Sequence, residues 1–299
     1  MTTRQAAHDA RMKRVLSYID QHLEDDLGLD ALSAVAALSK YHFHRQFRAS
    51  FGISVHRYVQ LVRMKRAGQV LAFTQGASVT EAALDVGYAA PDAFARVFRG
   101  RLGQTPSAFR DTPNWEEWLA GLWPMTNARS RLMKTKYSLD DVHTVEVPET
   151  PVAVLQHRGN PALVGATIQK FIGWRRAVGL KAAASQTYNV FHSDSEITPA
   201  DEFRVDICAA TDRTIEPNEQ GVEAGVIPAG RCAVLRAIGS ENVEPAIEFL
   251  YRDWLPSSGE TLRDFPLYCE RVSVVPVVAE HEVVTDIFLP LAMTSHIEA

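Results

Sequence analysis

An internal repeat is the strongest constraint on what this chain can fold into. The segment FHRQFRASFG at 43–52 recurs as FARVFRGRLG at 94–103, and the stretches just before them, 31–38 and 82–89, also correspond. A unit that recurs together with its flanks is larger than a single helix. We therefore predict two copies of a helix-turn-helix unit in the first third of the chain.

The second helix of each unit is predicted to have one apolar face and one basic face. In the first copy, Phe43 and Phe47 lie about 40° apart on a helical wheel, whereas Arg45 and Arg48 point away from them. This helix should pack through phenylalanine and present arginine to its surroundings.

Capping residues predict where these helices begin and end. Ser39 is placed to cap the start of the basic helix, Gly52 to end it, and Ser54 to open a further helix over 55–73. That further helix would connect the two units rigidly. An earlier helix with one apolar stripe would complete a small all-helical core: Met12, Val15, Leu16, Ile19 and Leu23.

A second repeat, at an offset of 80 residues, organises the rest of the chain. VPETPVAVLQHRG at 147–159 aligns with IPAGRCAVLRAIG at 227–239, and the same offset relates Asp206 to Asp286. Each copy has the pattern of a strand, a helix and two strands. We predict an α+β domain made of a duplicated β-α-β-β unit with pseudo-twofold symmetry, and a ligand site between its halves.

The two repeats divide the chain into three parts. We predict an all-helical domain over residues 1–112, a linker with a short helix over 113–140, and the α+β domain over 141–299. The linker is rich in tryptophan. These side chains would dock it on a neighbouring domain or, alternatively, form a ligand or partner surface: Trp115, Trp118 and Trp123.

Composition favours a globular protein of the cytoplasm. No run approaches 18 apolar residues and the first residues lack the apolar segment of a secretory signal, so we expect neither export nor membrane contact. The three cysteines form no CxxC pair, and no pattern predicts a metal site or a cofactor. Residues 1–110 hold 15 basic and 9 acidic residues, although the whole chain holds 31 and 36, so the first part is suited to a polyanion.

The first repeat resembles the DNA-binding domain of the AraC/XylS family of transcriptional regulators. The resemblance covers residues 8–110 and includes a characteristic set in the second unit: Gly87, Tyr88, Phe94, Arg96, Phe98, Gly103 and Pro106. Residues 141–299, including the terminal TDIFLPL, resemble more loosely the GyrI-like (Rob-type) effector-binding domain. The order of the two domains is also similar to that of Rob-type regulators.

The AraC/XylS resemblance implies that the second helix of each unit enters the major groove of promoter DNA. From their face and from the family we predict DNA contacts by Tyr41, His44, Arg45 and Arg48 in the first unit. The alternative is that these arginines form a solvated face. The second unit begins its helix with Ala90, Pro91 and Asp92, so we expect Arg96 and Arg99 to contact DNA there with less base readout.

Glu270 is the most informative residue of the second repeat, because its mate is the apolar Val190. A carboxylate among aromatic rings suits an organic cation, and the GyrI-like resemblance points to the same glutamate. We predict an effector site formed by Glu270, Tyr268, Tyr188, Trp174 and Trp254. Alternatively, Glu270 pairs with an arginine and the aromatic residues are core.

Together these patterns predict a ligand-responsive, sequence-specific transcriptional regulator that is not an enzyme. Its partners would be double-stranded promoter DNA, a small lipophilic or cationic effector, and RNA polymerase. Two alternatives stay open for the second domain: a small-molecule hydrolase with Glu270 as general base, and a protein-binding module.

Overall fold

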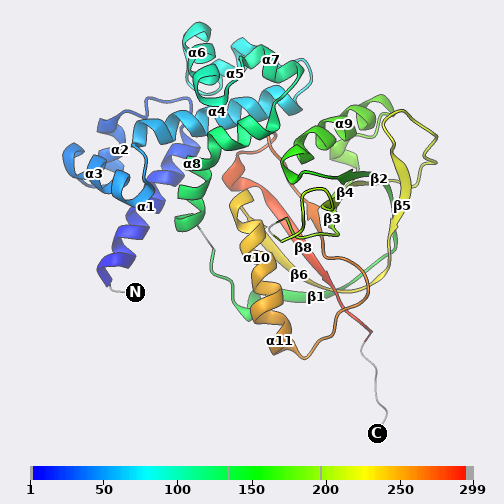
Figure 1. Ribbon diagram of the computed structural model, residues 1–299. Coiled ribbons are helices and arrows are strands. Elements are labelled where there is room, and N and C mark those ends of the chain that lie inside the picture. The colour runs from blue at the N-terminus through cyan, green and yellow to red at the C-terminus, as the bar shows by residue number, and fades with distance from the viewer. Residues whose placement is uncertain (1–2, 134, 196, 294–299) are drawn as a thin grey trace. The chain divides into compact units, whose positions relative to one another are not determined.

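The computed structural model describes residues 3–133, 135–195 and 197–293 and has two compact units (Figure 1). The first comprises residues 1–134 and 275–281, and the second comprises 135–274 and 282–299. The outermost residues of the predicted domains, 1–2 and 294–299, lie outside the described part.

The first unit is helical. In chain order its helices are α1 (Thr3–Gln21), α2 (Leu29–Val35), α3 (Lys40–Phe51), α4 (Val55–Phe73), α5 (Val79–Leu84), α6 (Pro91–Leu102), α7 (Pro106–Asp111) and α8 (Trp115–Met133). The pairs α2–α3 and α5–α6 are the two predicted helix-turn-helix units. Figure 1 shows α4 running between them. No helix among the described residues of the chain is both long and apolar enough to cross a membrane.

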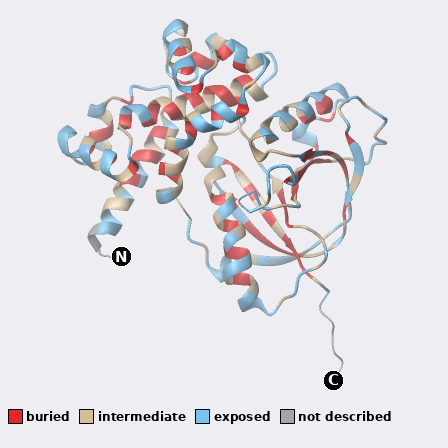
Figure 2. Cartoon of the chain, viewed as in Figure 1, coloured by how far each residue is buried: buried red, intermediate tan, exposed pale blue. Residues whose placement is uncertain are grey.

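The core of the first unit lies where the apolar stripes of its helices meet, as the buried positions in Figure 2 show. Phe43 and Phe47 of α3 and their repeat mates Phe94 and Phe98 of α6 are all fully buried. The helical spacing that predicted one apolar face for each of these helices is therefore confirmed. Tyr58 of α4 packs edge-on against Phe47, with ring centroids 5.6 Å apart.

Helix α8 differs from its prediction as a short helix in a linker. It has 19 residues and packs against both α3 and α6. Trp115, Trp118, Leu122 and Met125 form a buried stripe at helical spacing, so burial of this apolar face holds the helix in the unit. Trp123 points outward and is 64% exposed. The docking interpretation holds for the first two tryptophans.

The second unit is built on one antiparallel sheet of eight strands, which curls in Figure 1. Its order is β1-β6-β8-β7-β3-β4-β2-β5. The strands are β1 (Val142–Val147), β2 (Thr150–Arg158), β3 (Thr187–Phe191), β4 (Arg204–Ala210), β5 (Glu223–Ile227), β6 (Gly230–Ile238), β7 (Tyr268–Arg271) and β8 (Val284–Pro290).

This order confirms the predicted duplication. Strands β2, β3 and β4 of the first copy correspond to β6, β7 and β8 of the second, and the order reads the same from either edge. At the centre β3 pairs with β7, and Asn189 lies directly opposite its repeat mate Cys269. The pseudo-twofold axis therefore passes between these two residues. The sequence pattern did not predict β1 and β5, which are exposed edge strands with little apolar alternation.

The helices of the second unit pack on one face of the sheet. Helix α9 (Val164–Ala177) contacts β2 and β4, and α10 (Val243–Phe249) contacts β6 and β8. A π-helical turn, Leu250–Trp254, joins α10 to α11 (Leu255–Ser258). The opposite face carries a separate apolar cluster that contains Tyr188 and Tyr268.

The segment 275–281 connects β7 to β8 but belongs to the first unit. Lys65 of α4 forms a largely buried ion pair with Glu280, and Arg66 donates a hydrogen bond to the carbonyl oxygen of Val278 over 3.2 Å. These contacts attach the segment to the helix that joins the two helix-turn-helix units.

Candidate functional site

Helix α3 begins and ends where its capping residues require. The hydroxyl of Ser39 accepts a hydrogen bond from the backbone N–H of His42, which satisfies one free donor at the helix start. Gly52 ends the helix at a φ of 73°, in the left-handed region that favours glycine. The helix is thereby fixed in length and in the direction of its exposed face.

The four predicted residues of α3 gather on that exposed face. Tyr41, His44, Arg45 and Arg48 line one hollow of about 870 Å³. Tyr41 is 63% exposed, and both arginines are exposed as well. The structure therefore brings together all four residues predicted for the first unit.

Arg45 is held in an extended, outward position by Tyr41. Its Nη1 donates to the Tyr41 hydroxyl over 2.7 Å, and its guanidinium carbon lies 5.1 Å from the centre of the same ring. This contact orders a long side chain before any ligand arrives, which lowers the entropy cost of binding. Sequence reasoning missed Lys40, which lines the same hollow and pairs with Asp30.

Helix α6 presents a similar face with a weaker start. Its N-cap residue Ala90 supplies no side-chain hydrogen bond, and Asp92 is exposed in its first turn. Arg96 and Arg99 are exposed, as predicted. Arg101, not predicted, donates to the amide oxygen of Gln60 in α4 over 2.8 Å. This helix therefore has an acidic first turn and exposed arginines further along.

Both basic helices pack on α4 and α8, so they form one unit with a fixed separation. Helix α4 has 19 residues, which corresponds to a length of about 28 Å. Successive turns of the major groove lie about 34 Å apart along DNA. A frame of this size can place two helices in neighbouring grooves.

Glu270 lies in the central strand β7, directly opposite Tyr188 of β3 and Asp286 of β8. Residues opposite each other on neighbouring strands share a face of the sheet. Tyr268, two residues before Glu270, lies on this face too. The predicted combination of Glu270, Tyr188 and Tyr268 is therefore present at the pseudo-twofold centre.

The electrostatic surroundings of Glu270 are unbalanced. Burial raises the pKa of this carboxyl, and neighbouring Asp286 raises it further, whereas a hydrogen bond with Gln186 and the charge of Arg236 lower it. Arg236 gives Asp286 two hydrogen bonds of 2.7 Å, from Nε and Nη2. Arg236, whose charge acts on Glu270, is thus bonded to the other carboxylate.

The two tyrosines of this face are neutral phenols at ordinary pH. Burial raises the pKa of Tyr188 to about 12, and the nearby Glu270 charge acts in the same direction. Burial also raises the pKa of Tyr268, whose ring stacks on Phe288 with centroids 4.8 Å apart. Neutral aromatic rings beside a carboxylate provide an environment that attracts cations.

Trp174 and Trp254 do not lie with Glu270, contrary to the geometry expected from the sequence. Trp174 is buried under α9 in one apolar cluster, and Trp254 is buried under α10 in another. Neither cluster contains Tyr188 or Tyr268. Both tryptophans anchor a helix to the opposite face of the sheet, because their large apolar area is best buried there.

Asp206, the repeat mate of Asp286, has hydrogen-bonding partners of its own. His192 and Arg204 bond its carboxylate over 2.8 Å and 3.0 Å. Although burial acts to raise the pKa of Asp206, these hydrogen bonds and charges hold it below its usual value. The pair of aspartates is symmetric in position, but their partners differ.

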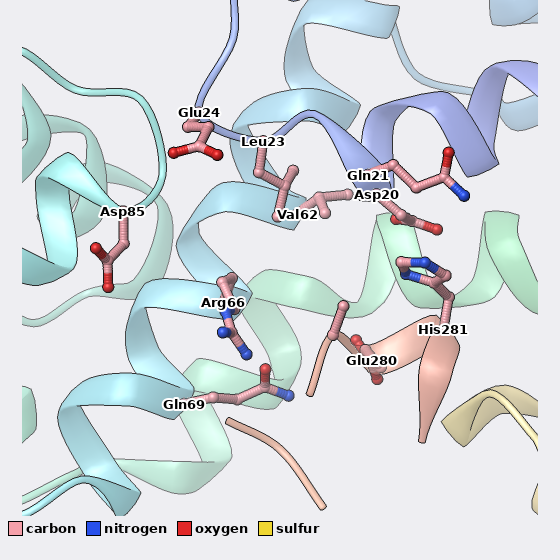
Figure 3. Close-up of a pocket in the computed structure, with 11 residues that line it drawn as sticks. Asp20, Gln21, Leu23, Glu24, Val62, Arg66, Gln69, Asp85, Glu280 and His281 are labelled. Atoms are coloured by element: carbon pink, nitrogen blue, oxygen red, sulfur yellow. The ribbon is translucent and has the colours of Figure 1, made fainter. Parts of the chain in front are cut away.

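A polar crevice of about 360 Å³ in the first unit contains none of the predicted site residues (Figure 3). It lies beside α1, α4 and the segment 275–281. Figure 3 shows side chains of mixed charge on its walls, among them Asp20, Arg66, Gln69 and Glu280.

Comparison with protein families identifies both units. A model described as a helix-turn-helix domain matches residues 32–112, and one described as a GyrI-like small molecule binding domain matches residues 140–292, which is half of the chain. The chain belongs to the GyrI-like family. It combines this small-molecule binding domain with an AraC-type helix-turn-helix DNA-binding domain, as the sequence resemblance implies.

Relatives of this GyrI-like protein include named regulators. The probable transcriptional regulator YgiV of Escherichia coli K12 is 36% identical over 154 residues, which cover 51% of this chain and 96% of YgiV. The regulatory protein PocR of Salmonella typhimurium is 36% identical over 107 residues, which cover 36% of this chain and 35% of PocR. The crystal structure of the EcmrR C-terminal domain aligns at a TM-score of 0.43 and 17% identity, over 50% of this chain and 96% of that chain.

Proposed function

We propose that this protein is a ligand-responsive transcriptional regulator of the cytoplasm. Helices α3 and α6 bind promoter DNA, and a small amphipathic cation binds beside Glu270 and changes the affinity for that DNA. RNA polymerase is the partner through which such binding would alter transcription.

The DNA-binding part of the proposal rests on the face of α3. Arginine can bond guanine with two donors in the major groove, and each good pair of this kind contributes about 1–3 kcal/mol of discrimination. Arg45, extended by Tyr41, is the residue best placed for base readout. Arg48, Arg96 and Arg99 are exposed on the same type of face and suit phosphate contacts.

The effector part rests on Glu270. This carboxylate is half-buried, and Arg236, whose charge acts on it, is bonded to Asp286. A partly desolvated charge without a close counter-charge is unfavourable, and a cationic ligand relieves that cost. Tyr188 and Tyr268 are only 7% and 2% exposed and belong to the buried apolar cluster on the same face, next to Glu270.

We propose binding rather than catalysis at this face. The three cysteines are buried and burial raises the pKa of each thiol, which disfavours the nucleophilic thiolate. Within the described residues no group of three or more His, Cys, Asp or Glu could hold a metal ion.

The DNA-binding part is tested by selecting duplexes from a random pool with the wild-type protein. The enriched duplex is then titrated with Arg45→Ala and with Arg131→Ala, a charge-matched control at an exposed position of α8. We expect Arg45→Ala to weaken binding by about 5- to 100-fold, corresponding to about 1–3 kcal/mol, and to relax the preference at one base pair. The control should bind within about threefold of wild type. Failure to enrich any motif, or equal affinity of the two variants, would refute this assignment of α3.

A further inference from the structure

Among the charged residues that differ between the two copies of the duplicated domain, two lie in one row across neighbouring strands. Glu270 has Val190 as its repeat mate, and Arg236 has Gln156. Asp286 lies between them: it is opposite Arg236 in the β6–β8 pair and opposite Glu270 in the β7–β8 pair. The three side chains thus form a row across neighbouring strands on one face.

Asp286 controls the position of the only positive charge in this row. Arg236 donates to both of its carboxylate oxygens, and the Asp286 side chain is 15% exposed. A bidentate pair of this kind fixes the plane of the guanidinium as well as its distance. Arg236 is therefore held against Asp286, although its charge still acts on Glu270.

The other half of the domain shows that the aspartate does not require this arginine. Asp206 is instead bonded by His192 and by Arg204 of its own strand. Gln156, which replaces Arg236 there, also donates to Asp206, over 3.3 Å. An arginine in the Arg236 position is thus found only in the half of the domain that carries the glutamate.

We propose that Asp286 and Arg236 are positioning residues that set the charge preference of the Glu270 site. Asp286 binds the guanidinium and prevents it from pairing with Glu270. The negative charge of the glutamate is then available to a cationic effector. This inference rests on the proposed function, because it assumes that Glu270 receives the effector. It adds the residues that make the site selective for cations over neutral or anionic compounds of the same shape.

Tetraphenylphosphonium and tetraphenylborate test the inference, because they have the same shape and opposite charge. Their dissociation constants are measured by calorimetry with the full-length protein, Glu270→Gln, Asp286→Asn, Arg236→Gln and the double variant Asp286→Asn/Arg236→Gln. Asp206→Asn serves as the control, because it removes the symmetry-related carboxylate. Thermal unfolding of each variant checks that it is folded.

We expect Asp286→Asn to weaken binding of the cation at least about tenfold, because the released Arg236 neutralises Glu270. Arg236→Gln should leave cation binding unchanged or tighter. The double variant should return to within about threefold of wild type, since it has no released guanidinium to neutralise Glu270. A purely structural role of the pair predicts the opposite, a double variant at least as weak as Asp286→Asn.

The pH profile of cation binding provides a second readout. Binding requires ionised Glu270, so its midpoint should move to lower pH in Asp286→Asn and to higher pH in Arg236→Gln, because Arg236 lowers the pKa of Glu270. Asp206→Asn should bind the cation with a dissociation constant within about threefold of wild type. The midpoint of its pH profile should equal that of wild type within experimental error.

Two different failures are distinguishable. If wild type binds the cation and Glu270→Gln does not, but Asp286→Asn binds like wild type or the double variant is not restored, only this inference is overturned. If wild type does not bind tetraphenylphosphonium, or Glu270→Gln binds it equally well, the proposed effector site fails and the inference fails with it.

Discussion

Glu270 is the residue on which the effector assignment depends, and its position was predictable from the repeat. Alignment of the two copies at an offset of 80 residues places the carboxylate of Glu270 where the other copy has Val190. The structure adds what the sequence did not contain: Asp286 is its neighbour across the strands and already holds Arg236. The alternative predicted that Glu270 pairs with an arginine, whereas Arg236 is bonded to Asp286.

Substituting Glu270 should change stability in a pH-dependent way. Because burial raises the pKa of Glu270 in the folded protein, ionisation at neutral pH opposes folding. Glu270→Gln should therefore raise Tm at pH 7.5, and the gain should shrink as the pH falls through the raised pKa, where the wild-type carboxyl is neutral as well. Thermal unfolding of both proteins from pH 5 to pH 8 measures this difference.

Asp206→Asn provides the control of opposite sign. The pKa of Asp206 is lowered in the folded protein, so its ionised form stabilises the fold above the unfolded-state pKa and that contribution is lost as the pH falls. The variant should have a reduced Tm at pH 7.5, with a smaller deficit at lower pH. A lower Tm for Glu270→Gln at neutral pH would contradict our description of its surroundings.

The tryptophans show the limit of repeat alignment at the residue scale. Trp174 and Trp254 align as well as the tyrosines do, and the sequence correctly made them equivalent. Equivalence does not specify which face of the sheet a helix covers. Burial under α9 and α10 decided that both lie on the face opposite Glu270.

Among the elements, α3 is expected to use different residues for folding stability and for DNA binding. Ser39 acts on the backbone at the helix start, whereas Arg45 extends from the exposed face. We expect Ser39→Ala to lower the free energy of unfolding by about 0.5–2 kcal/mol and to leave the base preference on the enriched duplex unchanged.

Arg45→Ala should leave the free energy of unfolding unchanged and relax the base preference, because it removes no cap and no buried contact. Urea unfolding and duplex titration of the two variants separate the effects. A changed base preference in Ser39→Ala, at protein concentrations where that variant is folded, would show that the cap also contacts DNA.

Strong periodic elements were predictable, and elements that depend on tertiary context were not. Helix α4 occupies the predicted range, 55–73, because serine caps and apolar spacing agree there. Helix α8 was predicted too short, although its buried residues keep helical spacing, because its range lies between the two repeats and contains Pro124. Strands β1 and β5 gave too weak a pattern, since pairing with a single neighbour determines them.

At the scale of the whole molecule, the chain passes between the two units three times, at 134–135, 274–275 and 281–282. The last two passages border the segment anchored to α4 through Lys65 and Glu280. Its ends continue into β7 and β8, the strands of Glu270 and Asp286. Strands β7 and β8 are thus covalently continuous with a segment attached to the helix that joins the two helix-turn-helix units.

In the proposed function, one ligand at Glu270 alters DNA binding by the helical unit. The most direct test is to measure the dissociation constant of the enriched duplex with and without saturating tetraphenylphosphonium, in wild type and in Glu270→Gln. Energetic coupling between two sites typically changes affinity by about 5- to 150-fold. We predict a change of at least about fivefold in wild type and none in Glu270→Gln. Equal DNA affinity in wild type with and without the bound cation would contradict the claim.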